Sequence, residues 1–144
     1  MYLMVKPERV RKLNSKEYAE GGVLYWMNRD MRIEDNWALI FAQEKAREYK
    51  TTLSIVYNFV PQFLGGGRRQ VDFKLGGLKS IEESCVKKNI SFEIIYDNSG
   101  KDTPTLLCEY IRSTITGLLV TDFCPLKTSR SWIDVLRKKV DIPF

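Results

Sequence analysis

The chain has 144 residues, 44% of them hydrophobic and 28% charged, which suits one domain with an ordinary core and excludes a disordered or collagen-like protein. A formal net charge of +5 permits an anionic partner but falls short of the concentrated basic stripe of a dedicated nucleic-acid binder. Three cysteines without a CxxC pair, and no histidine, argue against a disulfide framework, a metal site or a Ser-His-Asp triad.

Residues 1–20 predict a polar, basic arm with at most one short helix around Pro7 to Leu13. The arm has no apolar block of signal-peptide length, and no apolar run reaches the roughly 20 residues of a membrane helix. We therefore expect a cytoplasmic protein without membrane contact. Gly21-Gly22 separates the arm from one domain over residues 21–144.

Val23 to Met27 is an uninterrupted apolar run, typical of a strand that is covered on both faces of a parallel sheet. A charged loop follows, and Asp35 or Asn36 is a suitable N-cap for a helix with apolar residues at helical spacing. Further strands are expected over 51–60, 90–96 and 117–121. Helices are expected over 71–85, from Thr103-Pro104, and after a cap at Ser129 or Ser131.

This alternation predicts an α/β fold: a Rossmann-like, three-layer α/β/α domain with a mostly parallel sheet of four to five strands in the order 3-2-1-4(-5). Gly76-Gly77 in mid-helix suggests a close approach of that helix to the sheet. By this alternation a fifth strand is due at about the point where the sequence ends, so we expect the N-terminal part of a longer protein. Strand four would then be an exposed edge, which invites pairing with another chain.

In open parallel sheets, ligands bind beyond the carboxyl ends of the strands, where the strand order reverses. Here the loop 28–35 would face the loop 122–125 across a crevice. Arginines would meet polar or anionic groups, aspartates would accept hydrogen bonds and aromatic rings would hold a flat ligand. The candidate binding residues are Trp26, Met27, Asn28, Arg29, Asp30, Arg32, Tyr57, Asp122 and Phe123.

Two structural alternatives remain for these residues. The charged loop is also typical of an ion-pair network that caps the next helix, and the aromatic residues are also typical of core packing. Trp37 and Trp132 are predicted to be packing residues on helices. The sequence 65–70, with three glycines and two arginines, lacks the spacing and lysine of a phosphate-binding P-loop and indicates a flexible loop, and no GxGxxG follows the first strand. No catalytic residue is predicted.

Residues 24–39, LYWMNRDMRIEDNWAL, closely resemble the first strand, loop and helix of class II cyclobutane pyrimidine dimer photolyases. Other photolyase classes and cryptochromes carry a looser version of this motif. The stretches ERVRKLN (8–14), FKLGGL (73–78) and VTDFCPL (120–126) also resemble that family, in the same order.

The resemblance implies the N-terminal α/β domain of a DNA photolyase, a lyase that uses light to repair pyrimidine dimers in DNA. In some members this domain holds an antenna chromophore, a deazaflavin or a folate. The family's helical C-terminal domain, which is absent here, binds FAD and the damaged DNA, so this chain alone is not expected to be catalytic. Two alternatives remain: a free-standing nucleotide-binding module, and a purely structural domain that docks to the helical domain.

Overall fold

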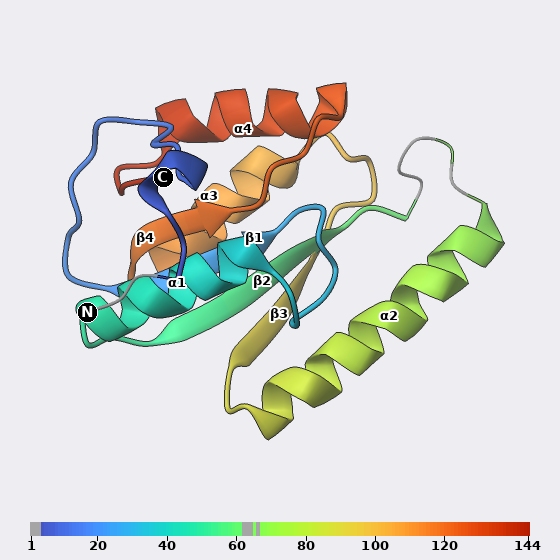
Figure 1. Cartoon of the computed structure of the whole chain (residues 1–144). Coiled ribbons are helices and arrows are strands. Elements are labelled where there is room, and N and C mark those ends of the chain that lie inside the picture. The colour runs from blue at the N-terminus through green and yellow to red at the C-terminus, as the bar shows by residue number, and fades with distance from the viewer. Residues whose placement is uncertain (1–3, 62–64, 66) are drawn as a thin grey trace.

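The computed structural model describes residues 4–61, 65 and 67–144, and Figure 1 shows the whole chain. In order, the elements are a short 3₁₀ helix (Pro7–Arg9), β1 (Gly22–Met27), α1 (Trp37–Glu48), β2 (Leu53–Phe59), α2 (Arg68–Lys87), β3 (Ser91–Tyr96), α3 (Thr103–Ser113), β4 (Thr116–Thr121) and α4 (Lys127–Lys139). Within the described residues, no helix is long and apolar enough to cross a membrane.

The four strands form one parallel sheet in the order β3-β2-β1-β4. Strand β1 lies at its centre, where Tyr25 pairs with Ile55 of β2 on one side and with Val120 of β4 on the other. The predicted α/β class and strand order are confirmed. Because the chain steps from β3 back across the sheet to β4, the carboxyl ends of β1 and β4 lie side by side.

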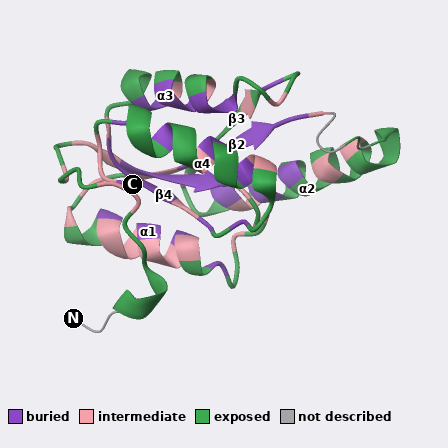
Figure 2. Ribbon diagram, turned by 90° about the horizontal axis from the view of Figure 1, so that it is seen from above, coloured by how far each residue is buried: buried purple, intermediate pink, exposed green. Residues whose placement is uncertain are grey.

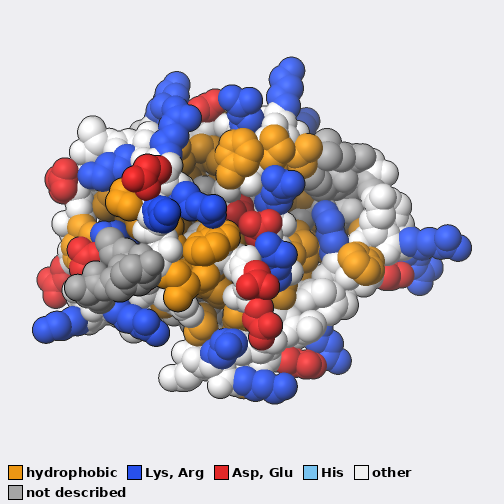
Figure 3. All heavy atoms as spheres, viewed as in Figure 1, with side chains coloured by type: hydrophobic (Ala, Val, Ile, Leu, Met, Phe, Trp, Pro, Cys, Tyr) orange, Lys and Arg blue, Asp and Glu red, His pale blue; other side chains and the backbone are white. Residues whose placement is uncertain are grey.

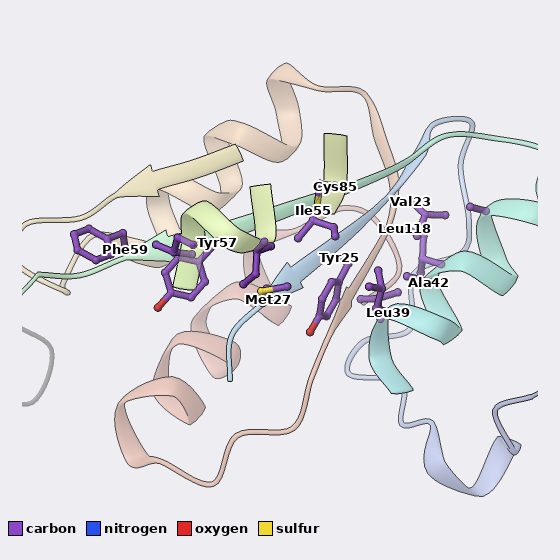
Figure 4. Packing of buried hydrophobic residues seen from close by; sticks show 14 residues of the cluster. Val23, Tyr25, Met27, Leu39, Ala42, Ile55, Tyr57, Phe59, Cys85 and Leu118 are labelled. Carbon is purple, nitrogen blue, oxygen red and sulfur yellow. The ribbon is translucent and has the colours of Figure 1, made fainter. Parts of the chain in front are cut away.

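Alternate residues of the strands supply two hydrophobic cores, one on each face of the sheet. Figure 2 shows buried residues concentrated on the strands, with the outward sides of the helices more exposed. Helices α1 and α2 cover the face that Figure 4 shows, through Leu39, Ala42, Ala46, Leu78, Ile81 and Cys85. Helices α3 and α4 cover the opposite face, through Leu107, Cys108, Ile111, Trp132 and Leu136.

Helix α2 covers the sheet with only part of its length. Its first buried residue is Leu78, and Figures 1 and 2 both show the preceding half of the helix extending past the ends of the strands. Gly76 and Gly77 are exposed, and a Cβ on Gly76 would meet no atom within 4 Å. The expected close approach of this glycine pair to the sheet is therefore wrong. Residues 68–70 form the first turn of α2, not a loop, while Gly66 lies outside the described residues.

Two further sequence predictions are corrected. Helix α4 begins at Lys127 with Leu126 at the N-cap, so Ser129 and Ser131 lie inside the helix. Leu126 has extended backbone angles and provides no side-chain cap, which is why the search for a capping serine misplaced the start. Trp37, predicted to be a packing residue, is the first residue of α1 and is 48% exposed, and its ring contacts Arg9 of the arm at 4.9 Å and not the core.

Both terminal segments pack against the domain. In the arm, Val5 is buried and the ring of Tyr18 stacks on that of Tyr49, with 3.8 Å between centroids. At the other end, the Leu119 N–H of β4 donates to the Pro143 carbonyl at 2.9 Å. The outer edge of β4 is therefore not bare at this point, in contrast to the expected open edge.

Candidate functional site

One carboxylate, that of Asp122, holds the loop between β1 and α1 through hydrogen bonds from the loop backbone. Asp122 follows β4 directly and accepts hydrogen bonds from the backbone N–H of Arg29 at 2.9 and 3.0 Å and from that of Asp30 at 2.7 Å. The hydroxyl of Tyr25 donates to the same carboxylate at 2.9 Å. The adjacent strand ends of β1 and β4 thus bring a side chain and a loop together that are more than 90 residues apart in sequence.

Asn36 holds the other end of this loop. Its side-chain oxygen accepts from the Leu39 N–H at 3.0 Å, which caps α1. Its amide group donates to the carbonyl of Arg32 at 3.0 Å and to the hydroxyl of Tyr25 at 2.9 Å. Of the two predicted N-caps, Asn36 is the one used. Tyr25 connects Asn36 to Asp122, so one buried network fixes both ends of the loop.

Burial shifts the pKa values of Asp122 and Tyr25 in this network. It raises the pKa of Asp122 above its ordinary value, although the hydrogen bonds from Asp30, Tyr25 and Arg29 oppose that shift. Burial, followed by the nearby charge of Asp122, also raises the pKa of Tyr25, so its hydroxyl keeps its proton at neutral pH. Since both oxygens of Asp122 already accept hydrogen bonds, this carboxylate positions the loop and is poorly placed to bind a ligand.

The charged side chains of the loop differ in burial. Arg29 and Arg32 are exposed and Asp30 is half-buried. In the described part of the chain, none of the ion pairs includes any of these three residues. The alternative of an ion-pair network that caps α1 is therefore not found among the described residues. Instead, Asp122 holds the loop and Asn36 caps α1 through hydrogen bonds from the backbone.

The predicted aromatic and apolar candidates lie in two different environments. Trp26 and Met27 are fully buried in opposite cores, and Tyr57 is only 5% exposed. Figure 4 shows Met27 and Tyr57 among the core side chains. Phe123, in contrast, is 77% exposed beside Asp122. The structure thus places six candidates in or beside the loop and the other three in the core. The six are Asn28, Arg29, Asp30, Arg32, Asp122 and Phe123.

Asn28, at the end of β1, has a distinctive polar environment. Its side-chain nitrogen is buried and has no hydrogen-bond partner among the described residues. Buried polar groups are nearly always paired, so an unpaired donor at a strand end calls for an explanation such as a ligand or an unseen partner. Trp26, by comparison, is satisfied, since its ring N–H donates to Asn58 at 2.7 Å.

The sequence did not predict the hydrogen-bonding roles of three buried residues, Tyr25, Asn58 and Asp97. Asp97 follows β3 and accepts from the N–H groups of Ser99, Gly100 and Asp102 and from the Thr103 hydroxyl. The only signal for it was the run of turn-forming residues at 97–102.

The two best-defined hollows of the described surface are not lined by residues 28–35 or 122–125. The smaller, of about 250 Å³, lies beyond the last turns of α3 and α4, around Cys108, Ile115 and Val140. The larger, of about 520 Å³, lies between the first turns of α3 and the length of α4. The crevice expected between the loops after β1 and β4 therefore stays a prediction.

Comparison with known proteins agrees with the fold and with the motif at β1. The DNA photolyase family model matches residues 23–143. A deoxyribodipyrimidine photo-lyase of Potorous tridactylus is 37% identical over 125 residues, and one of Arabidopsis thaliana is 34% identical over 140 residues. These matches cover 84% and 94% of this chain. The chain belongs to the DNA photolyase family, as its N-terminal α/β domain.

The chain corresponds to a limited part of these relatives. The matches span 22% of the length of the Potorous protein and 27% of that of the Arabidopsis protein. A photo-lyase of the archaeon Methanothermobacter thermautotrophicus is 28% identical, and its match spans 31% of that protein. Most of each relative therefore has no counterpart in these 144 residues.

Proposed function

We propose that this chain serves as the N-terminal domain of a class II type photolyase that repairs cyclobutane pyrimidine dimers in DNA with light, and that its role there is to dock the helical FAD-binding domain. The DNA photolyase family membership and the motif at residues 24–39 support this proposal. FAD would be bound by the helical domain, since the described loop after β1 carries no glycine-rich phosphate-binding sequence.

One observation carries the docking role: apolar side chains are exposed at the carboxyl ends of the strands. We call Phe73, Met31, Phe123 and Leu126 the strand-end surface. Phe73 is 85% exposed, Phe123 77% and Leu126 44%. Figure 3 shows hydrophobic side chains interspersed with charged ones on the face drawn in Figure 1. A contiguous patch of exposed apolar residues is typical of surfaces that bind another protein or domain, and we propose that these residues belong to one such patch.

The β1–α1 loop links the two sides of this surface. Its backbone is hydrogen-bonded to Asp122, next to Phe123, while the methyl group of Met31 approaches α2 at Gly77, 4.0 Å from where a Cβ would lie. The hydrogen bonds of Asp122 therefore fix the loop part of this surface before a partner domain binds. A preformed surface loses less conformational entropy on binding.

Association with the part of the Potorous photo-lyase beyond the matched segment would test docking, measured by sedimentation. The Potorous enzyme's own matching segment provides the positive control. We expect a 1:1 complex with this chain, and loss of that complex in the double variant Phe73→Asp, Phe123→Asp. The matched control is Val86→Asp, Ile115→Asp, which changes two residues that are 74% and 75% exposed at the opposite ends of the strands. Equal loss in both variants would contradict docking through the strand-end surface.

A second function, an antenna site, is favoured by the unpaired Asn28 amide. A deazaflavin or a folate carries ring carbonyls that would accept a hydrogen bond from this nitrogen, and exposed Phe123 offers a ring face. Neither of the two hollows described above reaches this point, and we propose that the docked domain completes the site.

Titration of each chromophore, followed by its absorbance, tests the antenna site on the docked complex and on the chain alone. We expect binding by the complex, weakened at least tenfold by Asn28→Ala. Binding of adenine nucleotides by the chain alone, with no chromophore bound by the complex, would favour the nucleotide-binding module instead.

A further inference from the structure

The larger hollow is lined by three lysines. It lies between α3 and α4 and has a volume of about 520 Å³. Among its lining residues, all of them described, there is no aspartate or glutamate. We call this site the lysine hollow and define it by Lys101, Lys127, Lys139, Thr105, Thr128 and Ser131.

We propose that the lysine hollow binds the phosphate backbone of DNA, which gives this domain its own contact with the substrate of the parent enzyme. The inference rests on the proposed function for the identity of that substrate. Lysine ammonium groups and serine or threonine hydroxyls are the side chains that most often contact backbone phosphates, and such contacts carry no sequence information. Such contacts would increase the affinity for DNA without recognition of its base sequence.

The spacing of the lysines favours a chain of phosphates over a single one. Lys127 and Lys139 lie at opposite ends of α4, about 18 Å apart along its axis at 1.5 Å per residue. Both are exposed, as is Lys101 on the loop before α3. One phosphate would reach one end of the hollow only. A polymer with a charge at every nucleotide would engage all three lysines together.

Helix α4 extends the same positive charge. It carries five basic residues and one acidic residue, Asp134, which pairs with Arg137 at 3.2 Å. Figure 3 shows lysine and arginine side chains projecting from the upper surface, where Figure 1 places α4. The basic residues of α4 are Lys127, Arg130, Arg137, Lys138 and Lys139.

The wall of the hollow is fixed by internal hydrogen bonds. Trp132 donates from its ring N–H to the Gly100 carbonyl at 3.0 Å, which ties α4 to the loop that carries Lys101. The carboxylate of Asp97 organises that loop through its hydrogen bonds to the backbone of Ser99, Gly100 and Asp102. Gly100 has a φ of +70°, and a Cβ there would lie 3.2 Å from Val60. These contacts fix the backbone of the loop on which Lys101 lies.

Salt-dependent DNA binding by this chain tests the proposal. A fluorescent duplex of about 20 base pairs would be titrated between low and physiological salt, where each backbone contact contributes about 0.9 to the slope of log K against log salt. For the triple variant Lys101→Gln, Lys127→Gln, Lys139→Gln, we expect the slope to fall in magnitude by about 2 to 3. The conservative variant with three arginines should retain the slope.

The matched control removes the same charge from the opposite face of the sheet, in the variant Lys79→Gln, Lys87→Gln, Lys88→Gln on α2 and its C-cap. We expect its slope to stay within about one of that of the unchanged protein. Equal effects of the two triple variants, or an unchanged slope in the hollow variant, would overturn the proposal. Circular dichroism and the thermal midpoint verify that both variants remain folded.

Inorganic phosphate distinguishes a backbone contact from a site for one free phosphate. At matched ionic strength, phosphate and chloride should displace the duplex equally if the hollow binds a polyanion. Saturable displacement of the duplex by phosphate but not by chloride would overturn the proposal that the hollow binds the DNA backbone. Because the docking measurement contains no DNA, failure here and failure of the proposed function give different results.

Discussion

At the scale of single residues, Asp122 is the carboxylate to which the backbone of the β1–α1 loop is hydrogen-bonded. Its two oxygens serve two backbone N–H groups and one hydroxyl, and the residue is only 4% exposed. A carboxylate suits this place because all three partners are donors. An amide in its place would present a donor to other donors, which leaves buried groups unpaired.

We predict that Asp122→Asn lowers the free energy of unfolding by about 1–3 kcal/mol, the usual cost of leaving a buried polar group unpaired. Urea unfolding followed by circular dichroism measures it. The control is Glu34→Gln, the same chemical change at an exposed position in the same loop, which should cost less than about 0.5 kcal/mol. Equal costs in the two variants would mean that the Asp122 hydrogen bonds contribute nothing to stability.

Asp97 gives a prediction for pH. Burial opposes ionisation of Asp97, but the hydrogen bonds from Thr103, Gly100 and Ser99 outweigh it and lower its pKa below the ordinary value of 3.8. A carboxyl whose pKa is lowered on folding stabilises the protein above its unfolded pKa, and that stability is lost as the pH falls through the folded pKa.

The stability advantage of the unchanged protein over Asp97→Asn should therefore be full above about pH 5 and shrink as the pH falls below about 4. Urea unfolding at a series of pH values measures the difference. An advantage that is constant across this range, or that grows towards low pH, would show that the pKa of Asp97 is not lowered in the folded state.

At the scale of elements, α2 is unusual because the fully buried residues of this 20-residue helix all lie in its second half, while Val71 in the first half is only partly buried. Glycine costs about 1 kcal/mol relative to alanine inside a helix, so Gly76 weakens α2 without any packing gain in this chain. Under the docking proposal, the exposed half of α2 contributes Phe73 to the strand-end surface.

We predict that Gly76→Ala raises the free energy of unfolding of this chain by about 0.5–1 kcal/mol, because nothing obstructs a Cβ there. Gly100→Ala is the comparison: its φ of +70° and the contact with Val60 should make it destabilising. Thermal or urea unfolding of both variants measures the effect. Destabilisation by Gly76→Ala would mean that the helix is already packed at that point.

The sequence predicted the elements better than it predicted the site. The apolar run at 23–27 and the regular spacing of strands and helices were enough for the sheet order, since parallel strands and right-handed crossovers leave few arrangements. The predicted strand order already placed the loop 122–125 opposite the loop 28–35. The partners of Asp122 and Tyr25 were not predictable, because their hydrogen bond joins residues that are 97 positions apart. Similarly, a net charge of +5 did not reveal that three lysines from two segments line one hollow.

At the scale of the whole molecule, two surfaces of the described residues carry our two proposals. The carboxyl ends of the strands expose apolar side chains over a rigid loop, while α4 and the loop before α3 expose lysines around a hollow. On our account the first side binds the helical domain and the second contacts DNA. Neither side needs this chain to perform the chemistry of repair.

Light-dependent repair in a reconstituted system tests the central claim most directly. A duplex with one cyclobutane pyrimidine dimer would be illuminated with this chain plus FAD, with the remaining part of the Potorous photo-lyase, and with both. We predict no repair by this chain alone, and repair by the mixture at a rate above that of the Potorous part alone, with the gain lost in Phe73→Asp, Phe123→Asp. Repair by this chain alone, or no gain where the Potorous enzyme's own matching segment gives one, would contradict the account.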